Sequence, residues 1–176
     1  MVIRRELGQL LPNQAHFFNG DTLYKRFTPA GPDHAQVAAC AGIADYIDLL
    51  ADHHGIEGDP SARGQGVHDL MRAHEEALLQ PLLDYLKGRN GLRLLGPDQA
   101  GHRAPTVALA LTRPGAEAAA QLAERGIMAG GGDFYAVRPL RAMGIDPDKG
   151  VLRLSFVHYT EKEEIDKLLN ALDDIL

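Results

Sequence analysis

The sequence lacks most of the features that mark disulfide-rich, membrane or nucleic-acid-binding proteins. Its 176 residues contain one cysteine, Cys40, which excludes an internal disulfide and any zinc or iron–sulfur site built from several cysteines. Lysine and arginine number 18 against 24 acidic residues, and no basic run occurs, so we expect no nucleic-acid partner. No apolar stretch is long enough to cross a bilayer, and the first residues lack a signal-peptide core. We therefore expect a cytoplasmic protein without a membrane partner.

A recognisable metal motif is also missing. The eight histidines include no HExxH spacing. In His74-Glu75-Glu76 the carboxylates lie off the histidine face of the predicted helix. We interpret His53-His54, His68 and His74 as parts of solvated helix faces. A metal-dependent hydrolase is accordingly the least favoured function, and we expect no metal ligand.

Apolar periodicity in the first half of the chain predicts two long helices. Residues recur at three- and four-residue intervals over about 35–53. A polar loop with four glycines and one proline is expected over 55–66, followed by a helix over about 67–86. Pro81 lies inside this second pattern and predicts either a kink near Ala77 or two shorter helices.

In the second half of the chain, strand patterns alternate with helix patterns. A capping box of Thr160 and Glu163 begins a terminal helix. The other expected elements are strands at residues 92–95, 105–111 and 151–157, and helices at about 114–125 and 136–143. This order predicts an α/β (α+β) fold, in which helices cover one face of a small sheet.

Arg153 is the strongest candidate for a ligand-binding residue. Leu152 and Leu154 flank it in a predicted strand, so the arginine points away from these apolar neighbours, toward a groove or solvent. A guanidinium can hold a carboxylate through two parallel hydrogen bonds. The alternative is an arginine on a solvated sheet face.

Two loops offer further candidates. The segment from Gly130 to Tyr135 (Gly-Gly-Gly-Asp-Phe-Tyr) would let the backbone approach a ligand, with Phe134 and Tyr135 as an apolar wall, or it is a flexible connection. His34 lies in a Pro-Asp-His turn before a helix N-terminus, where anions bind favourably. The alternative there is that Asp33 or His34 is a simple N-cap.

Taken in order, these segments resemble the C-terminal end of the pyridoxal-phosphate (PLP) enzymes of the class V aminotransferase and cysteine desulfurase family. Residues 26–34 resemble the loop that reaches a neighbouring subunit's cofactor phosphate. Residues 126–140 resemble the active-site loop, and residues 151–160 resemble the strand that carries the substrate-binding arginine. The resemblance implies a remnant of the large domain over residues 1–88 and the small C-terminal domain over 89–176. Residues 1–4 look like the end of a strand, which fits a chain that is the C-terminal portion of such an enzyme.

The resemblance also implies roles for individual residues. Arg153 and Tyr135 would bind an amino-acid substrate, Gly31 and His34 would contact the PLP cofactor of the intact family, and the enzyme would be a homodimer. Three departures limit what this chain can do alone. None of its five lysines lies in the context of the Schiff-base lysine, Gly31 replaces a threonine, and residues 133–136 lack the cysteine that desulfurases need.

We therefore expect no catalytic residue in this chain. The expected function is the C-terminal part of a PLP-dependent, class V aminotransferase-like enzyme that is inactive in isolation. The alternative is a non-catalytic binding or dimerisation module that retains the small-domain fold.

Overall fold

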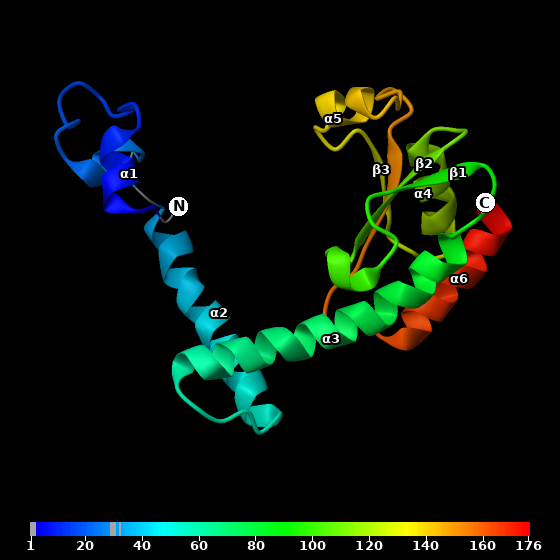
Figure 1. Cartoon of the computed structure of the whole chain (residues 1–176), viewed down its shortest axis with the longest axis horizontal. Coiled ribbons are helices and arrows are strands. Elements are labelled where there is room, and N and C mark those ends of the chain that lie inside the picture. Colours follow the sequence, from blue (N-terminus) through cyan, green and yellow to red (C-terminus); the bar gives the residue numbers. More distant parts are fainter. Residues whose placement is uncertain (1–2, 29–30, 32) are drawn as a thin grey trace. The chain divides into compact units, whose positions relative to one another are not determined.

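A computed structural model describes residues 3–28, 31 and 33–176, and these residues form two compact units, Met1–Gly64 and Gln65–Leu176 (Figure 1). The boundary falls within helix α3 (Pro60–Leu86). The division into a large-domain remnant over 1–88 and a small domain over 89–176 stays a prediction.

The first unit is built from short local elements and one long helix. These are α1 (Arg5–Leu10), the 3-10 helix η1 (Leu23–Arg26), α2 (His34–His53) and the first turn of α3. Arg26 closes the N-terminal segment, because its Nη2 donates to the carbonyl oxygens of Gln9 (3.2 Å) and Leu11 (2.6 Å). The predicted helix over 35–53 is confirmed by α2. In the described part of the predicted strand end, Ile3 and Arg4 are not in a strand, and residues 1–2 lie outside the described residues.

Helix α3 begins earlier than predicted and is not interrupted. The side chain of Asp59 accepts a hydrogen bond from the backbone N–H of Ala62 (2.9 Å), and Pro60 occupies the first helical position. The predicted loop over 55–66 is therefore wrong from residue 60 onward. The alternative of two shorter helices at Pro81 is also wrong, since the helix continues through it. Burial explains the continuity: leucines on both sides of Pro81 pack in the core, namely Leu78, Leu79, Leu82, Leu83 and Leu86.

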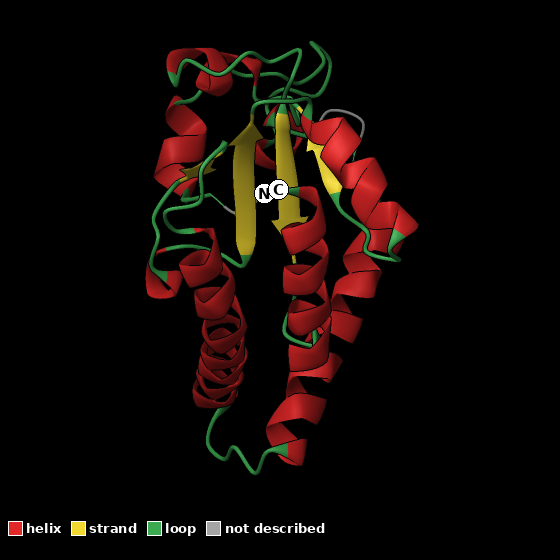
Figure 2. Ribbon diagram, turned by 90° about the vertical axis from the view of Figure 1, so that its right-hand side faces the viewer, coloured by secondary structure: helices red, strands yellow, loops and turns green. Residues whose placement is uncertain are grey.

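The second unit contains a four-stranded antiparallel sheet flanked by helices (Figure 2). Its strands are β1 (Leu92–Leu95), β2 (Thr106–Leu111), β3 (Gly130–Gly132) and β4 (Val151–Ser155), in the order β1-β2-β4-β3. The remaining elements are the 3-10 helix η2 (Ala100–His102), α4 (Gly115–Glu124), α5 (Val137–Ala142) and α6 (Lys162–Ile175). The predicted α/β class, with a small sheet and helices, is confirmed, whereas the sequence pattern predicts a loop where β3 lies.

Alternation along the strands separates two faces of the sheet. The main core lies where Val107, Leu109, Leu152 and Leu154 meet buried residues of α3, α4 and α6. A smaller cluster on the other face contains Leu140 from α5 together with Ile145 and Val151. Three helices thus cover one face, as expected, and α5 covers only part of the other. We call this second face, with Arg153 at its centre, the open face.

The start of α6 differs by one residue from the prediction. The capping box is formed by Glu161 and Glu164, whose side chains each bond the other's backbone N–H. Thr160 lies before it, where its Oγ1 accepts from the backbone N–H of Val157 (3.2 Å). Its carbonyl oxygen accepts a hydrogen bond from Nε2 of His74 (2.8 Å). His74 is therefore not merely on a solvated face, because it connects α3 to the turn before α6.

A second polar contact joins the ends of α3 and α6. The Tyr85 hydroxyl donates to Asp173 Oδ1 (2.9 Å), Arg89 pairs with the same carboxylate, and the Arg89 guanidinium lies 3.9 Å from the Tyr85 ring centroid. Burial, with the hydrogen bond to Asp173, raises the pKa of Tyr85 to about 12. The hydrogen bonds from Tyr85 and Arg89 lower the pKa of Asp173. The phenol therefore stays protonated, and able to donate, at neutral pH.

Candidate functional site

Arg153 lies near the middle of β4 with small residues on both sides. Across the sheet its partners are Ala108 of β2 and Gly130 of β3. Neither neighbour has a side chain long enough to cover the guanidinium, and Arg153 is exposed. The predicted direction of this side chain is confirmed, because Leu152 and Leu154 are buried in the core on the opposite face.

The guanidinium of Arg153 contacts the ring of Phe134. Its Cζ lies 4.0 Å from the ring centroid, a distance at which a cation is attracted to an aromatic face. Within residues 3–28, 31 and 33–176, no carboxylate forms an ion pair with Arg153. Its N–H donors are therefore available to a ligand, because the Phe134 ring has no oxygen atom that would accept hydrogen bonds from them.

Two hydroxyl groups lie on the same face of the sheet. Ser155 follows Arg153 by two residues in β4 and is paired with Thr106 of β2. The Thr106 hydroxyl donates to the Ser155 Oγ (3.2 Å), and both residues are exposed. Guanidinium and hydroxyl groups together give the open face hydrogen-bonding groups suited to a carboxylate.

A tight turn after β3 places Phe134. The backbone N–H of Ala136 donates to the carbonyl oxygen of Asp133 (2.8 Å), and the Asp133 side chain accepts from the N–H of Tyr135 (3.0 Å). Phe134 and Tyr135 have φ angles of 51° and 59°. Positive φ at both central residues is the pattern of a type I′ turn, which ordinarily uses Asn-Gly.

The structure brings Phe134 to Arg153 and leaves Tyr135 in solvent. The Phe134 ring lies over Gly130, because a Cβ at Gly130 would be only 2.9 Å from the Phe134 Cζ. Tyr135 is fully exposed. Of the two residues predicted to form an apolar wall, Phe134 contacts Arg153 and Tyr135 does not. The role of Tyr135 in substrate binding stays a prediction.

The two predicted cofactor-contacting residues belong to the first unit. Gly31 has φ 92° and its N–H donates to the carbonyl oxygen of Thr28 (2.9 Å). His34 is the first residue of α2, and Asp33 caps this helix by accepting from the N–H groups of Ala35 and Gln36. Pro29, Ala30 and Pro32 of the predicted phosphate-side loop lie outside the described residues. The cofactor roles of Gly31 and His34 stay predictions.

The lysines of this chain do not fit the covalent attachment of PLP at the open face. In the second unit each lysine is engaged elsewhere: Lys87 with Asp98, Lys149 with the carbonyl of Thr112, Lys162 with Asp166 and Lys167 with the carbonyl of Gly126. In the first unit, Lys25 lies over the Tyr24 ring (5.2 Å). Cys40 is on α2, and no group of three or more His, Cys, Asp or Glu in the described residues is placed to hold a metal ion.

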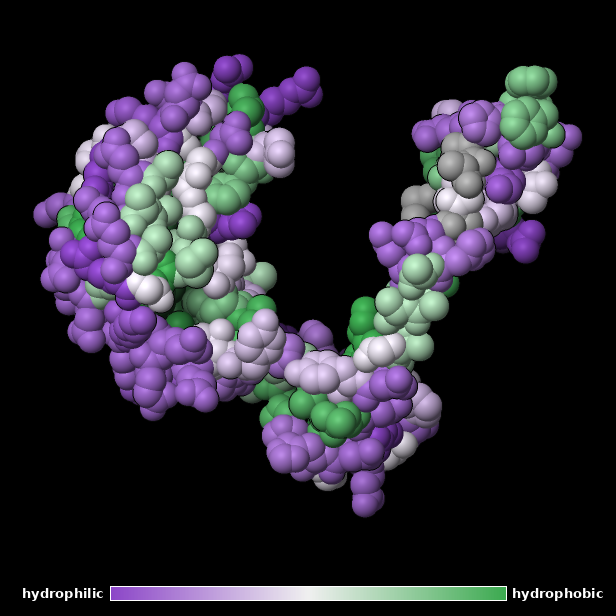
Figure 3. Space-filling view, turned by 180° about the vertical axis from the view of Figure 1, so that it is seen from behind, coloured by the Kyte–Doolittle hydropathy of each residue, from purple (hydrophilic) through white to green (hydrophobic). Residues whose placement is uncertain are grey.

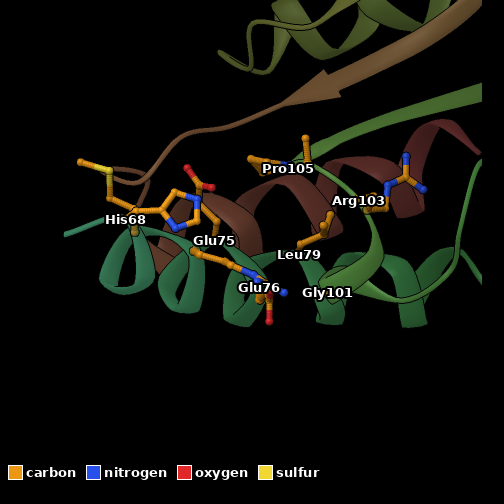
Figure 4. Close-up of a pocket in the computed structure, with 10 residues that line it drawn as sticks. His68, Glu75, Glu76, Leu79, Gly101, Arg103 and Pro105 are labelled. Atoms are coloured by element: carbon orange, nitrogen blue, oxygen red, sulfur yellow. The ribbon is translucent and has the colours of Figure 1, made fainter. Parts of the chain in front are cut away.

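A cavity of about 290 Å³ lies elsewhere in the second unit, between α3 and residues 101–105 (Figure 4). His68 and Glu75 lie at one end of it and Arg103 at the other. Its arginines already have partners: Arg72 pairs with Glu76 (2.6 Å), and Arg103 donates to the carbonyl oxygens of Pro97 and Thr106. The sequence pattern gave no indication of this cavity. The open face around Arg153 remains the better candidate, because no residue in the described part of the chain occupies the N–H donors of Arg153.

Known proteins are similar to this chain over most of its length. Residues 65–168 match the family described as Aminotransferase class-V. An aminotransferase-like protein (FGM3) of Gibberella zeae is 29% identical over 94% of this chain, and a probable cysteine desulfurase of Pseudomonas putida is 34% identical over 78% of it. The chain spans only 39% and 29% of the lengths of these two relatives.

Solved structures of cysteine desulfurases are also similar to this chain. The cysteine desulfurase CsdA from Escherichia coli is similar over 65% of this chain and 28% of its own, with 25% identity and a TM-score of 0.50. A cysteine desulfurase from Thermococcus onnurineus NA1 covers 66% of this chain and 29% of its own, with 21% identity and a TM-score of 0.55, which supports the fold alone. Among the described residues, no helix is both long and apolar enough to span a bilayer.

Proposed function

The chain belongs to the class V aminotransferase family, and from this premise we propose that it supplies the substrate-carboxylate site of a PLP-dependent enzyme that acts on an amino acid. Arg153 carries the proposal. Its guanidinium is exposed, lies between two small cross-strand neighbours and forms no ion pair within the described part of the chain. A planar fork of N–H donors matches the two oxygens of a carboxylate.

The residues present in this chain indicate which part of the reaction it would support and which part the cofactor would supply. When bound, PLP supplies an electron sink for the bond changes at the substrate's α-carbon. Arg153 holds the carboxylate and so orients the α-carbon, while the Ser155 hydroxyl is placed on the same face as a further hydrogen-bonding group. In this proposal a lysine outside the 176 residues holds the cofactor, and the isolated chain is inactive.

Substituting Arg153 with lysine tests the carboxylate site. We expect L-alanine to bind the wild-type chain with a Kd on the order of 1–10 mM, seen as saturable shifts of the Gly130 and Phe134 amide signals in NMR spectra of ¹⁵N-labelled protein. Arg153→Lys keeps the charge but loses the two-pronged contact, so binding should weaken by about tenfold. Arg125→Lys, at the end of α4, is the matched control and should bind as wild type does. Equal affinity in Arg153→Lys would contradict the proposal.

Covalent trapping tests the inactivity of the isolated chain. After incubation with PLP and reduction with borohydride, mass spectrometry is expected to find no single lysine preferentially labelled, because each lysine of the second unit is engaged away from the open face. Stoichiometric labelling of one lysine would show that this chain holds the cofactor itself. In that case the expectation that this chain lacks the Schiff-base lysine would be wrong, although the carboxylate site could stand.

A second candidate function is the non-catalytic binding or dimerisation module. Exposed apolar side chains on α2 support it: Val37, Ile43 and Leu49 are 60, 62 and 62% exposed, and apolar surface is visible along this helix in Figure 3. A homodimer interface along α2 would cover some of these side chains under either function. The module becomes the favoured function if L-alanine binding does not depend on Arg153.

A further inference from the structure

We propose that Phe134 is a positioning residue, whose ring is a platform that holds the Arg153 guanidinium ready for a carboxylate. The inference rests on the proposed function of Arg153 as the carboxylate-binding residue. The observation that carries it is the cation–π contact itself, with Arg153 Cζ 4.0 Å from the centroid of the Phe134 ring. No carboxylate among the described residues forms an ion pair with this guanidinium.

Arg153 needs such a platform because its strand neighbours cannot hold it. Ala108 presents only a methyl group, and Gly130 has no side chain. A long arginine side chain in this setting would sample many rotamers, and fixing one of them when a ligand binds costs side-chain entropy. A ring in contact with the guanidinium restricts these rotamers before the ligand arrives, so less entropy is lost on binding.

The contact with Phe134 leaves the N–H donors of the arginine without an oxygen acceptor. The ring attracts the positive charge of the guanidinium, whereas a carboxylate accepts hydrogen bonds from its N–H groups. The ring offers no hydrogen-bond acceptor that would compete with the ligand. An acidic side chain in its place would hold Arg153 equally well, but it would occupy the donors that the ligand requires.

Local geometry fixes the ring in this place. Phe134 is half-buried and packs against the small cluster of Leu140, Ile145 and Val151. The missing side chain of Gly130 provides the space over which the ring lies. Positive φ at a phenylalanine and then at a tyrosine is unfavourable, and such a conformation persists only where the surrounding structure imposes it. The turn is therefore strained, and it holds the Phe134 ring in contact with the Arg153 guanidinium.

Phe134→Leu tests the platform, with Phe134→Tyr as the matched control. Leucine keeps an apolar side chain in the small cluster but removes the flat aromatic face, so we expect L-alanine to bind about 3–10-fold more weakly. Tyrosine keeps the face and should bind within about twofold of wild type. In the ligand-free protein, the NMR signal of the Arg153 Nε–H group should show a ring-current shift in wild type and Phe134→Tyr. That shift should be absent in Phe134→Leu.

The outcomes separate this inference from the proposed function. If Phe134→Leu binds L-alanine as tightly as wild type while Arg153→Lys does not, the platform is wrong and the carboxylate site stands. If Arg153→Lys binds as well as wild type, the proposed function fails first. If Phe134→Leu does not fold, the wild-type signal decides, because an Arg153 Nε–H group without a ring-current shift overturns the platform by itself.

Discussion

Replacing Gly131 with alanine is expected to lower the free energy of unfolding by roughly 3 kcal/mol. A Cβ at this position would lie 2.4 Å from the Cα and N atoms of Ala116 and 2.4 Å from the carbonyl carbon of Gly115. These are backbone atoms at the start of α4, so no side-chain rotation relieves the overlap. Either α4 moves away from β3, which loses packing in the main core, or β3 leaves the sheet, which loses its backbone hydrogen bonds to β4.

Urea unfolding followed by circular dichroism measures this effect. Gly101→Ala is the control, because it is the same chemical change in the same unit with nothing nearer to the new Cβ than the Glu76 side chain at 3.7 Å. The two substitutions restrict the unfolded chain equally, so the difference reports the folded state. Gly101→Ala should stay within about 0.5 kcal/mol of wild type. Similar midpoints for both variants would mean that α4 does not rest directly on β3.

Replacing Gly150 with alanine is the second substitution with a large expected cost, again roughly 3 kcal/mol. Two causes add here. Gly150 has φ 60°, a conformation that costs an alanine about 1–2 kcal/mol. The new Cβ would also lie 2.4–2.6 Å from the backbone of Gly132, whose cross-strand partner Val151 follows Gly150 directly.

A second glycine separates these two causes. Gly144 has φ 72°, but a Cβ added there would meet no atom within 4 Å, so Gly144→Ala should show the conformational cost alone, about 1–2 kcal/mol. The excess loss in Gly150→Ala then measures the overlap with Gly132. Thermal unfolding monitored by calorimetry gives both values. Equal losses in the two variants would exclude a close approach of the Gly150 turn to β3.

Periodic apolar patterns make most of the second unit predictable. Alternation of Leu152 and Leu154 with Arg153 indicates both the strand and the face on which the arginine lies, since the side-chain direction in a strand follows from its period of two. The terminal helix is equally accessible, because Ile165, Leu168 and Leu172 recur on one stripe and are buried. In these segments local pattern and tertiary packing agree.

Elements that are stabilised mainly by contacts with their neighbours cannot be predicted from local apolar periodicity. Strand β3 consists of three glycines, which have no strand propensity and no apolar period, and its existence depends on pairing with β4 and on the backbone of α4 beneath it. The start of α3 is a second example. Asp59 followed by Pro60 indicates a helix start, with an N-cap and a proline at the first helical position, but the glycines in the first turns of α3 favour a loop in the sequence pattern.

The site is predictable in part for the same reason. Arg153 can be found from its place in a strand pattern, but the Phe134 platform cannot. A type I′ turn is recognised from sequence by Asn-Gly, and here Phe-Tyr occupies the two positive-φ positions. Only the three-dimensional packing of Phe134 on Gly130 and the small cluster makes that turn stable.

The all-glycine strand has a thermodynamic consequence for the site. Having no side chains, β3 buries no apolar surface of its own, and each glycine loses more conformational entropy on ordering than any other residue. Among the described residues, it lies at the edge of the sheet and is paired with β4 alone. Such a segment opens locally at a lower free energy than the main core, so its amide hydrogens should exchange early. Because Phe134 comes two residues after the end of β3, opening of this strand would also release the ring that contacts Arg153, while the rest of the fold stays intact.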